Sequence, residues 1–294
     1  MSRNDAADPT AHSAIQPRVP THGGPMTTAQ QTRVRARPKR NEPLLFGAAG
    51  ILTLLILLQT IPTIGIVNPK FFPPLSEILQ ALMVQFSRPE FWSAFGSTIL
   101  GWLLGLAIAT ALGVILGILL ASVPVLGKLM HSTIEFLRPI PSVALVPLAV
   151  LLFGTTMNAT LLLVIYASLW QVLFQVMYGV KDVDPVAIDT AKSYRLSTWT
   201  TIRRVIWPSI TPYVIIGVRL AAAVALVLEI TGELVIGSPG IGKLIVTAQS
   251  SGATASMYSL VLIAALLGVV VNIGARTAEQ KLLFWHASIR TEAH

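Results

Sequence analysis

Long runs without a charged residue divide the chain into predicted membrane spans. A helix needs about 20 predominantly apolar residues to cross the hydrocarbon core of a bilayer. Uncharged or nearly uncharged apolar runs predict six such spans, near residues 44–66, 95–121, 127–153, 159–179, 212–236 and 257–278. The pattern therefore predicts an all-α, polytopic membrane protein with about six transmembrane helices.

The composition agrees with this pattern. Apolar residues make up 53% of the 294 positions, charged residues 12%, and the mean hydropathy is +0.71. Soluble domains carry about 25% charged residues, so a soluble enzyme is excluded. The chain has no cysteine, which excludes disulfides and thiolate metal sites.

The two ends differ from the apolar middle. Residues 1–43 contain six prolines and few large apolar side chains, so we expect a disordered basic tail. Residues 44–285 form the predicted transmembrane domain, and 286–294 form a short C-terminal tail.

The net charge of +8 has two interpretations, a nucleic-acid or anionic-lipid patch, or the positive-inside rule of membrane proteins. With a cytoplasmic amino terminus, 16 of the 21 Lys and Arg residues lie in cytoplasmic segments and 3 in outer loops. This distribution predicts that the amino terminus is cytoplasmic and that nucleic acid is not a partner.

Two of the predicted spans have internal patterns. Small residues recur every fourth position in the second span, at Gly101, Gly105, Ala109, Gly113 and Gly117. Such a stripe lets another helix approach closely. The third span contains Pro139, Pro141 and Pro147. These prolines either free backbone carbonyls that face protein or a cavity, or produce a simple kink.

The longest polar stretch between spans, residues 180–211, predicts a compact helical hairpin. Asp184 followed by Pro185 is typical of a helix start, and Ser197 can cap a second short helix that runs to about Ile206. We expect Pro208 and Pro212 to end that helix before the fifth span. A structured connection of this length indicates a docking element.

This hairpin resembles the cytoplasmic coupling loop of ATP-binding-cassette (ABC) importer permeases, the EAA loop. Asp189, Thr190 and Ala191 stand at its Glu-Ala-Ala positions, and Pro208 stands at its later proline. The family's glycine is replaced by Arg195, and a left-handed turn there costs a side chain roughly 1 kcal/mol more than glycine. The resemblance and the pattern assign ATPase coupling to Asp184, Pro185, Ala187, Asp189, Thr190, Ala191, Arg195, Leu196 and Pro208.

Other segments resemble the nitrate, sulfonate and taurine importer group. They are Phe72–Ile78, the Arg-Pro-Ile-Pro run that starts at Arg138, and the fifth-span region with Arg219, Glu233 and residues 240–242. The resemblance implies the type I permease fold in a bacterial cytoplasmic (inner) membrane. It also implies a second permease copy in a homodimer, a cytoplasmic ATPase dimer that binds ATP and magnesium, and an external solute-binding protein. No cofactor is expected on this chain.

Residues 237–243 fit the first seven positions of a phosphate-binding P-loop. The eighth position is Leu244, where a hydroxyl should ligate magnesium, and the stretch follows a membrane helix instead of a strand. We therefore expect a glycine-rich re-entrant or connecting loop, and no ATPase activity in this chain.

Five ionisable residues lie inside predicted spans, and such groups usually face a bundle interior or an aqueous path. They are Glu135, Arg138, Arg219, Glu229 and Glu233. Either they line or gate a translocation path, to which we assign Glu135, Arg138, Pro141, Glu229 and Glu233, or they lock helices through ion pairs. Glu135 and Arg138 are spaced to pair on one helix face, and Arg219 is expected to snorkel. No metal site is predicted.

These features favour the membrane-spanning permease subunit of an ATP-driven importer, which carries a small solute and catalyses no covalent chemistry. Two alternatives stay open. A proton-coupled secondary transporter would use the intramembrane carboxylates, and a membrane scaffold would transport nothing. Sulfonate, taurine, nitrate, bicarbonate and a neutral heterocycle all remain candidate solutes.

Overall fold

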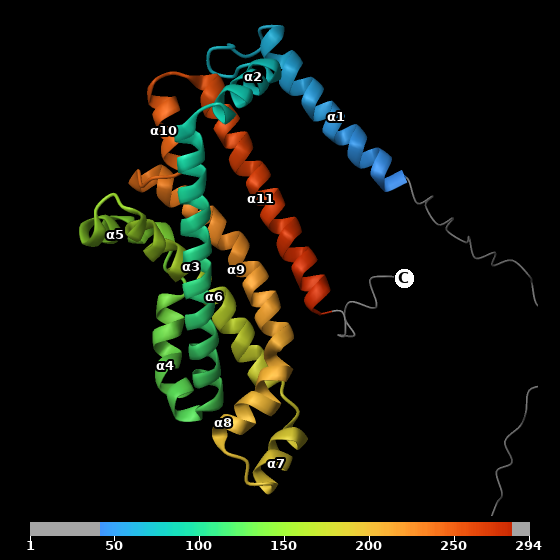
Figure 1. Ribbon diagram of the computed structural model, residues 1–294, viewed down its shortest axis with the longest axis vertical. Helices are drawn as coiled ribbons and strands as arrows, with labels where there is room; N and C mark the ends of the chain where they lie inside the picture. The colour runs from blue at the N-terminus through green and yellow to red at the C-terminus, as the bar shows by residue number, and fades with distance from the viewer. Residues whose placement is uncertain (1–41, 284–294) are drawn as a thin grey trace, which may run out of the picture. The chain divides into compact units, whose positions relative to one another are not determined.

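The computed structural model describes residues 42–283, and every regular element in this range is helical (Figure 1). The predicted C-terminal tail and nearly all of the predicted N-terminal tail lie outside the described residues. The account below concerns the compact unit that begins at Gly50. In chain order the helices are α1 (Glu42–Thr63), α2 (Leu75–Phe86), α3 (Pro89–Ser122), α4 (Pro124–Leu137), the 3₁₀ turn η1 (Ser142–Leu145), α5 (Val146–Phe153), α6 (Met157–Lys181), α7 (Pro185–Ser193), α8 (Thr198–Thr201), the π-helical turn η2 (Ile202–Ile206), α9 (Trp207–Ile236), α10 (Ile241–Ser250) and α11 (Thr254–Leu282).

The helices confirm the membrane class. In the described part of the chain five helices are long and apolar enough to cross a bilayer, and the count is six if one bent pair is a single span. The first, second, fourth, fifth and sixth predicted spans correspond to α1, α3, α6, α9 and α11. The bent pair corresponds to the third.

The third span is not a straight helix, as 127–153 would require. Its two halves, α4 and the η1–α5 segment, meet at an angle of 86°. Pro141 has no N–H for the carbonyl of Leu137, and the Tyr166 hydroxyl of α6 donates to that carbonyl at 2.6 Å. The same carbonyl accepts the Ile140 N–H at 3.1 Å, so it is fully satisfied within the protein at a break that is too sharp for a simple kink.

The small-residue stripe of α3 forms the core of the unit. All five of its members are buried. A Cβ added at Gly105, Gly113 or Gly117 would overlap a valine of α6, namely Val164, Val172 or Val176. The stripe therefore brings α3 against α6, as the sequence predicts, and α6 also packs on α9.

Two short helices were missed from the sequence. The structure has a helix, α2, after the first span, and a second, α10, where a loop is predicted. Phe91 of α3, Ile241 and Ile245 of α10 and Leu260 of α11 share one buried cluster. Figure 1 shows α10 and α2 at one end of this unit and α7 and α8 at the other. We call these the α10 end and the hairpin end.

Candidate coupling hairpin and the charged residues of the spans

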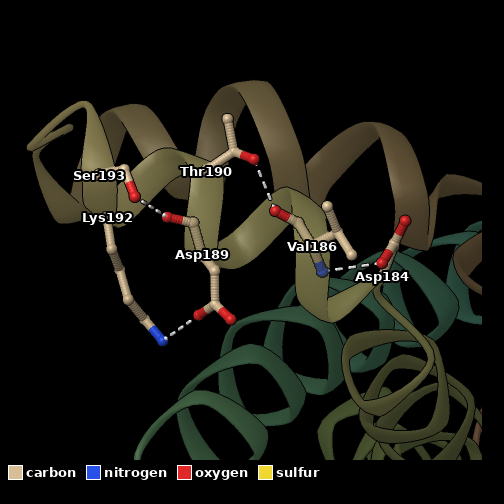
Figure 2. Close-up of polar contacts among 6 residues, drawn as sticks. All are labelled: Asp184, Val186, Asp189, Thr190, Lys192 and Ser193. Carbon is tan, nitrogen blue, oxygen red and sulfur yellow. Dashed lines mark hydrogen bonds and ion pairs between the residues drawn. The ribbon is translucent and has the colours of Figure 1, made fainter.

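We call residues 182–206 the hairpin. Its first helix, α7, begins where the sequence predicts. Asp184 is the N-cap of α7, and its Oδ1 accepts a hydrogen bond from the Val186 N–H at 2.8 Å (Figure 2). Pro185 occupies the first turn, where its missing N–H costs nothing. Further along, the Lys192 ammonium lies 2.9 Å from Asp189 Oδ1, and the Thr190 hydroxyl donates to the Val186 carbonyl. Asp189 and Thr190 are thus engaged within their own helix.

Arg195 adopts the left-handed turn despite its side chain. Its φ is 51°, the only positive φ at a non-glycine position among residues 42–283. The Arg195 N–H donates to the Lys192 carbonyl at 2.9 Å, and the Leu196 N–H donates to the Ala191 carbonyl at 3.0 Å. These two bonds define a Schellman motif, which closes the end of α7. The turn between the two helices keeps the geometry that a glycine would favour.

The second half of the hairpin differs from the prediction at its end. Ser197 caps α8 as predicted, because its Oγ accepts a hydrogen bond from the Thr200 N–H at 3.2 Å. Pro208 and Pro212, however, do not end the helix, since helical backbone runs from Thr198 to Ile236. The π-helical turn η2 comes just before Pro208, and such a widened turn rearranges backbone bonding where a proline supplies no N–H.

Apolar contacts and one side-chain bond seat the hairpin on the spans. Val183, Ile188 and Ile206 join the buried cluster of Val172, Val176 and Ile210 from α6 and α9. Ala191 is buried as well. The Tyr213 hydroxyl of α9 donates to Asp182 Oδ2 at 2.5 Å, and the Tyr213 ring covers Gly179 so closely that a Cβ there would overlap it. The start of the hairpin is thereby tied to the helix that follows it.

The outer surface of the hairpin carries large apolar side chains beside polar ones. Val186, Tyr194 and Trp199 are each more than 70% exposed, and Leu196 is also exposed. Asp184, Pro185 and Pro208 are exposed, and Ala187 is half-buried. Exposed apolar side chains on a structured element between spans are typical of a protein contact surface.

At the α10 end, Glu233 is fully buried in a hydrogen-bond network. The Thr98 hydroxyl of α3 donates to Glu233 Oε1 at 2.7 Å, and the Gly242 N–H donates to Oε2 at 2.8 Å. The Ile241 N–H donates to Thr98 Oγ1 at 3.0 Å. Glu233 and Thr98 therefore cap the first turn of α10, and the P-loop-like stretch has two of its N–H groups already bonded within the protein.

Glu229, one turn earlier in α9, is also buried. Its carboxyl lies against Gly101, where an added Cβ would overlap it. Glu229 Oε2 has no hydrogen-bond partner in the described part of the chain. Gly101, which the pattern assigned to helix packing, is thus the position that makes room for a carboxyl group.

The ionisable residues of α4 and its break are exposed instead. Glu135 lies 3.4 Å from His131 Nδ1, with both side chains about two-thirds exposed, and does not form the predicted pair with Arg138. Arg138 follows the last residue of α4, and its guanidinium carbon lies 4.5 Å from the centre of the Phe174 ring of α6. Pro141 is exposed at the break.

Arg219 does not simply snorkel. Its Nη1 lies 2.6 Å from Glu279 Oε2, so an ion pair joins α9 to α11.

Sequence analysis missed Glu279, Thr98, Tyr213 and Asp182 because each acts through a partner distant in the sequence. Within residues 42–283 no cluster of three His, Cys, Asp or Glu side chains is placed to hold a metal ion.

Comparison with known proteins supports the resemblance. Residues 109–283, which include the hairpin, match the family described as binding-protein-dependent transport system inner membrane component. The chain is 26% identical to the taurine transport system permease protein TauC of Escherichia coli over 81% of its length and 90% of that protein. It is 28% identical to the putative aliphatic sulfonates transport permease protein SsuC of E. coli, over 78% and 87%. It is also 28% identical to the bicarbonate transport system permease protein CmpB of Synechocystis, over 80% and 88%.

Solved structures have the same fold. A bacterial alginate ABC transporter, determined with an alginate-bound periplasmic protein, matches with a TM-score of 0.59 and 14% identity over 83% of this chain and 96% of the other. The MetNI methionine ABC transporter, in an inward-facing conformation, matches with a TM-score of 0.55 and 14% identity over 63% and 92%. The family match covers more than half of the residues. The chain therefore belongs to the binding-protein-dependent transport system inner membrane components, multi-pass permease subunits of ABC importers whose ATPase is a separate subunit.

Proposed function

We propose that the chain moves a small oxyanion, such as a sulfonate, taurine or bicarbonate, across the cytoplasmic membrane, and that the hairpin at 182–206 docks on the ATPase. The named functions of three relatives support this class of solute. One observation supports the docking role. The hairpin packs on α6 and α9 through a shared apolar cluster, and its outer surface exposes Val186, Tyr194 and Trp199.

In this proposal the amino terminus and the hairpin are cytoplasmic, and α10 faces the external solute-binding protein. A second permease copy completes the path. The exposed apolar face of α5, with Leu148, Leu151 and Leu152, is suited to that contact. Closure of the ATPase dimer on ATP and magnesium would move the hairpin, and α6 and α9 would follow because their side chains share its core.

The proton-coupled alternative has less support. It would use Glu229 and Glu233, and both side chains are buried inside the protomer, 1% and 0% exposed. Glu233 is also bonded to Gly242 and Thr98. We propose that Glu233 holds α9 to α3 and α10, while Glu135, Arg138 and Pro141 lie on the side open to a path.

A matched pair of tryptophan variants tests the docking role. Trp199→Ala removes an exposed side chain of the hairpin, and Trp92→Ala removes one that is also exposed but lies beside α2, where its Nε1 donates to the Phe86 carbonyl. We expect Trp199→Ala to weaken copurification of the ATPase about 30-fold, the effect of losing an interface hot spot of about 2 kcal/mol. We expect the Trp92 variant to bind the ATPase like wild type.

A second variant, Ala187→Glu, places a charge on the half-buried face of α7 and should lower ATP hydrolysis by the assembled complex. If Trp199→Ala and Ala187→Glu both assemble with the ATPase and support wild-type hydrolysis, the hairpin is not the docking element. A permease that copurifies with no ATPase at all would instead favour the scaffold alternative.

A further inference from the structure

The Arg138 side chain is a cation without a carboxylate partner at a break in a membrane span. It stands where α4 ends and the chain turns by 86° toward α5. Its guanidinium carbon lies 4.5 Å from the centre of the Phe174 ring, and no Asp or Glu of residues 42–283 comes within 4.0 Å of its nitrogen atoms. Glu135, the nearest acid in the sequence, contacts His131 instead.

An unpaired arginine within a span is costly in lipid, so such residues face water, a partner or a ligand. Arg138 is exposed at the surface of the protomer, whereas Glu229 and Glu233 are buried inside it. Arg219, the other arginine singled out in the spans, is neutralised by Glu279. The charge exposed at the break is therefore positive, although α9 contains two carboxylates.

A second donor without an acceptor lies in the same row of aromatic rings. Tyr166, Trp170 and Phe174 follow one another along α6, with ring centres 5.8 Å and 6.3 Å apart. The Tyr166 hydroxyl donates to the Leu137 carbonyl, and the buried Trp170 Nε1, which lies next to that hydroxyl, makes no well-aligned hydrogen bond. Arginine offers five N–H donors and the indole offers one, and neither group can accept a hydrogen bond.

We propose that Arg138, which lies over Phe174 with Trp170 as the next ring of the row, forms the site at which the permease meets the oxyanion group of its solute. A guanidinium held over an aromatic ring still offers its N–H fork to a planar or tetrahedral oxyanion. The site rests on the proposed function for its physiological meaning, but anion binding can be measured without transport. A phospholipid headgroup would offer the same chemistry as a sulfonate, and the experiment separates these two sources.

The test uses the full-length permease in nanodiscs of zwitterionic phosphatidylcholine, with sodium ethanesulfonate as the probe and sodium chloride at equal ionic strength as the reference. Ethanesulfonate should raise the unfolding temperature of wild type with a saturable dependence on concentration. Arg138→Gln should raise the half-saturating concentration at least tenfold, and Arg138→Lys should recover part of the loss. Trp170→Phe should weaken binding several-fold.

Lys128→Gln is the matched control, because it neutralises an exposed positive charge on α4 and should bind ethanesulfonate as wild type does. The proposal is overturned if ethanesulfonate does not stabilise wild type, or if Arg138→Gln responds as wild type does. Stabilisation by added phosphatidylglycerol alone would assign the site to lipid and overturn the solute site.

The same variants separate this proposal from the proposed function. Loss of ATPase binding by the hairpin variants with unchanged ethanesulfonate binding would support both ideas. Normal ethanesulfonate binding by a permease that recruits no ATPase would refute the coupling role and leave the anion site standing. Disruption of a permease dimer by Arg138→Gln, with no change in ethanesulfonate binding by the remaining protomer, would assign Arg138 to a contact between copies and overturn the proposal.

Discussion

At the scale of single residues, Arg195 and Gly101 differ from what their local sequence patterns predict. Arg195 occupies a left-handed conformation that normally selects glycine, and a pair of backbone bonds holds it there. Gly101 looks like one more member of a packing stripe, yet the space it leaves is filled by the carboxyl of Glu229. In both cases the residue type alone does not give the role of the position, and the three-dimensional contacts show it.

The strain at Arg195 yields the first prediction. Arg195→Gly should stabilise the permease by about 1 kcal/mol, because glycine adopts a positive φ without the clash that a Cβ brings. Thermal unfolding of the purified protein in detergent measures the shift. Arg195→Ala is the control, since it removes the same charge but keeps the Cβ. Equal unfolding temperatures for the two variants would show that charge, and not the turn conformation, sets the effect.

At the scale of elements, the sequence predicts those features that depend on local patterns. The uncharged runs locate the spans, and Asp184 and Ser197 correctly mark where α7 and α8 begin. The carbonyl at the break is bonded by Tyr166, which lies 29 positions away in the sequence, so no local pattern could indicate this contact. The π-helical turn before Pro208 likewise keeps a helix continuous where proline alone predicts an end.

The tie between Tyr213 and Asp182 yields a prediction about the hairpin as an element. Tyr213→Phe removes the hydroxyl but keeps the ring on Gly179, so the fold should persist while the hairpin loses about 1 kcal/mol of stabilisation. Amide hydrogen exchange should accelerate about fivefold across residues 183–206 and stay unchanged in α10 and α11. Tyr258→Phe, which removes a hydroxyl from α11, is the control. Uniform acceleration throughout the molecule would mean that the bond supports the whole fold and not the hairpin.

At the scale of the whole molecule, the distribution of charge connects fold and function. The family, the spans and the hairpin follow from the sequence, because each leaves a pattern in residue type or spacing. The roles of the individual intramembrane charges do not follow from the sequence, because they depend on contacts between distant helices. Glu233 caps α10 from α9, and Glu279 of α11 pairs with Arg219. Arg138 has no carboxylate partner of this kind among the described residues, and its positive charge is exposed at the break.

The orientation of the molecule in the membrane is the last prediction, and the absence of cysteine makes it direct to test. Two cysteine variants are made, Ser193→Cys at the hairpin end and Ser250→Cys at the α10 end. Both serines are exposed, and each donates its hydroxyl to the carbonyl four residues earlier at 2.9 Å, so the two variants perturb their helices alike. With a cytoplasmic hairpin, a membrane-impermeant maleimide should label Ser250→Cys in intact cells. It should label Ser193→Cys only after permeabilisation. The reverse pattern would place the hairpin outside, where no cytoplasmic ATPase could reach it, and would contradict the orientation that the 16-to-3 distribution of basic residues predicts.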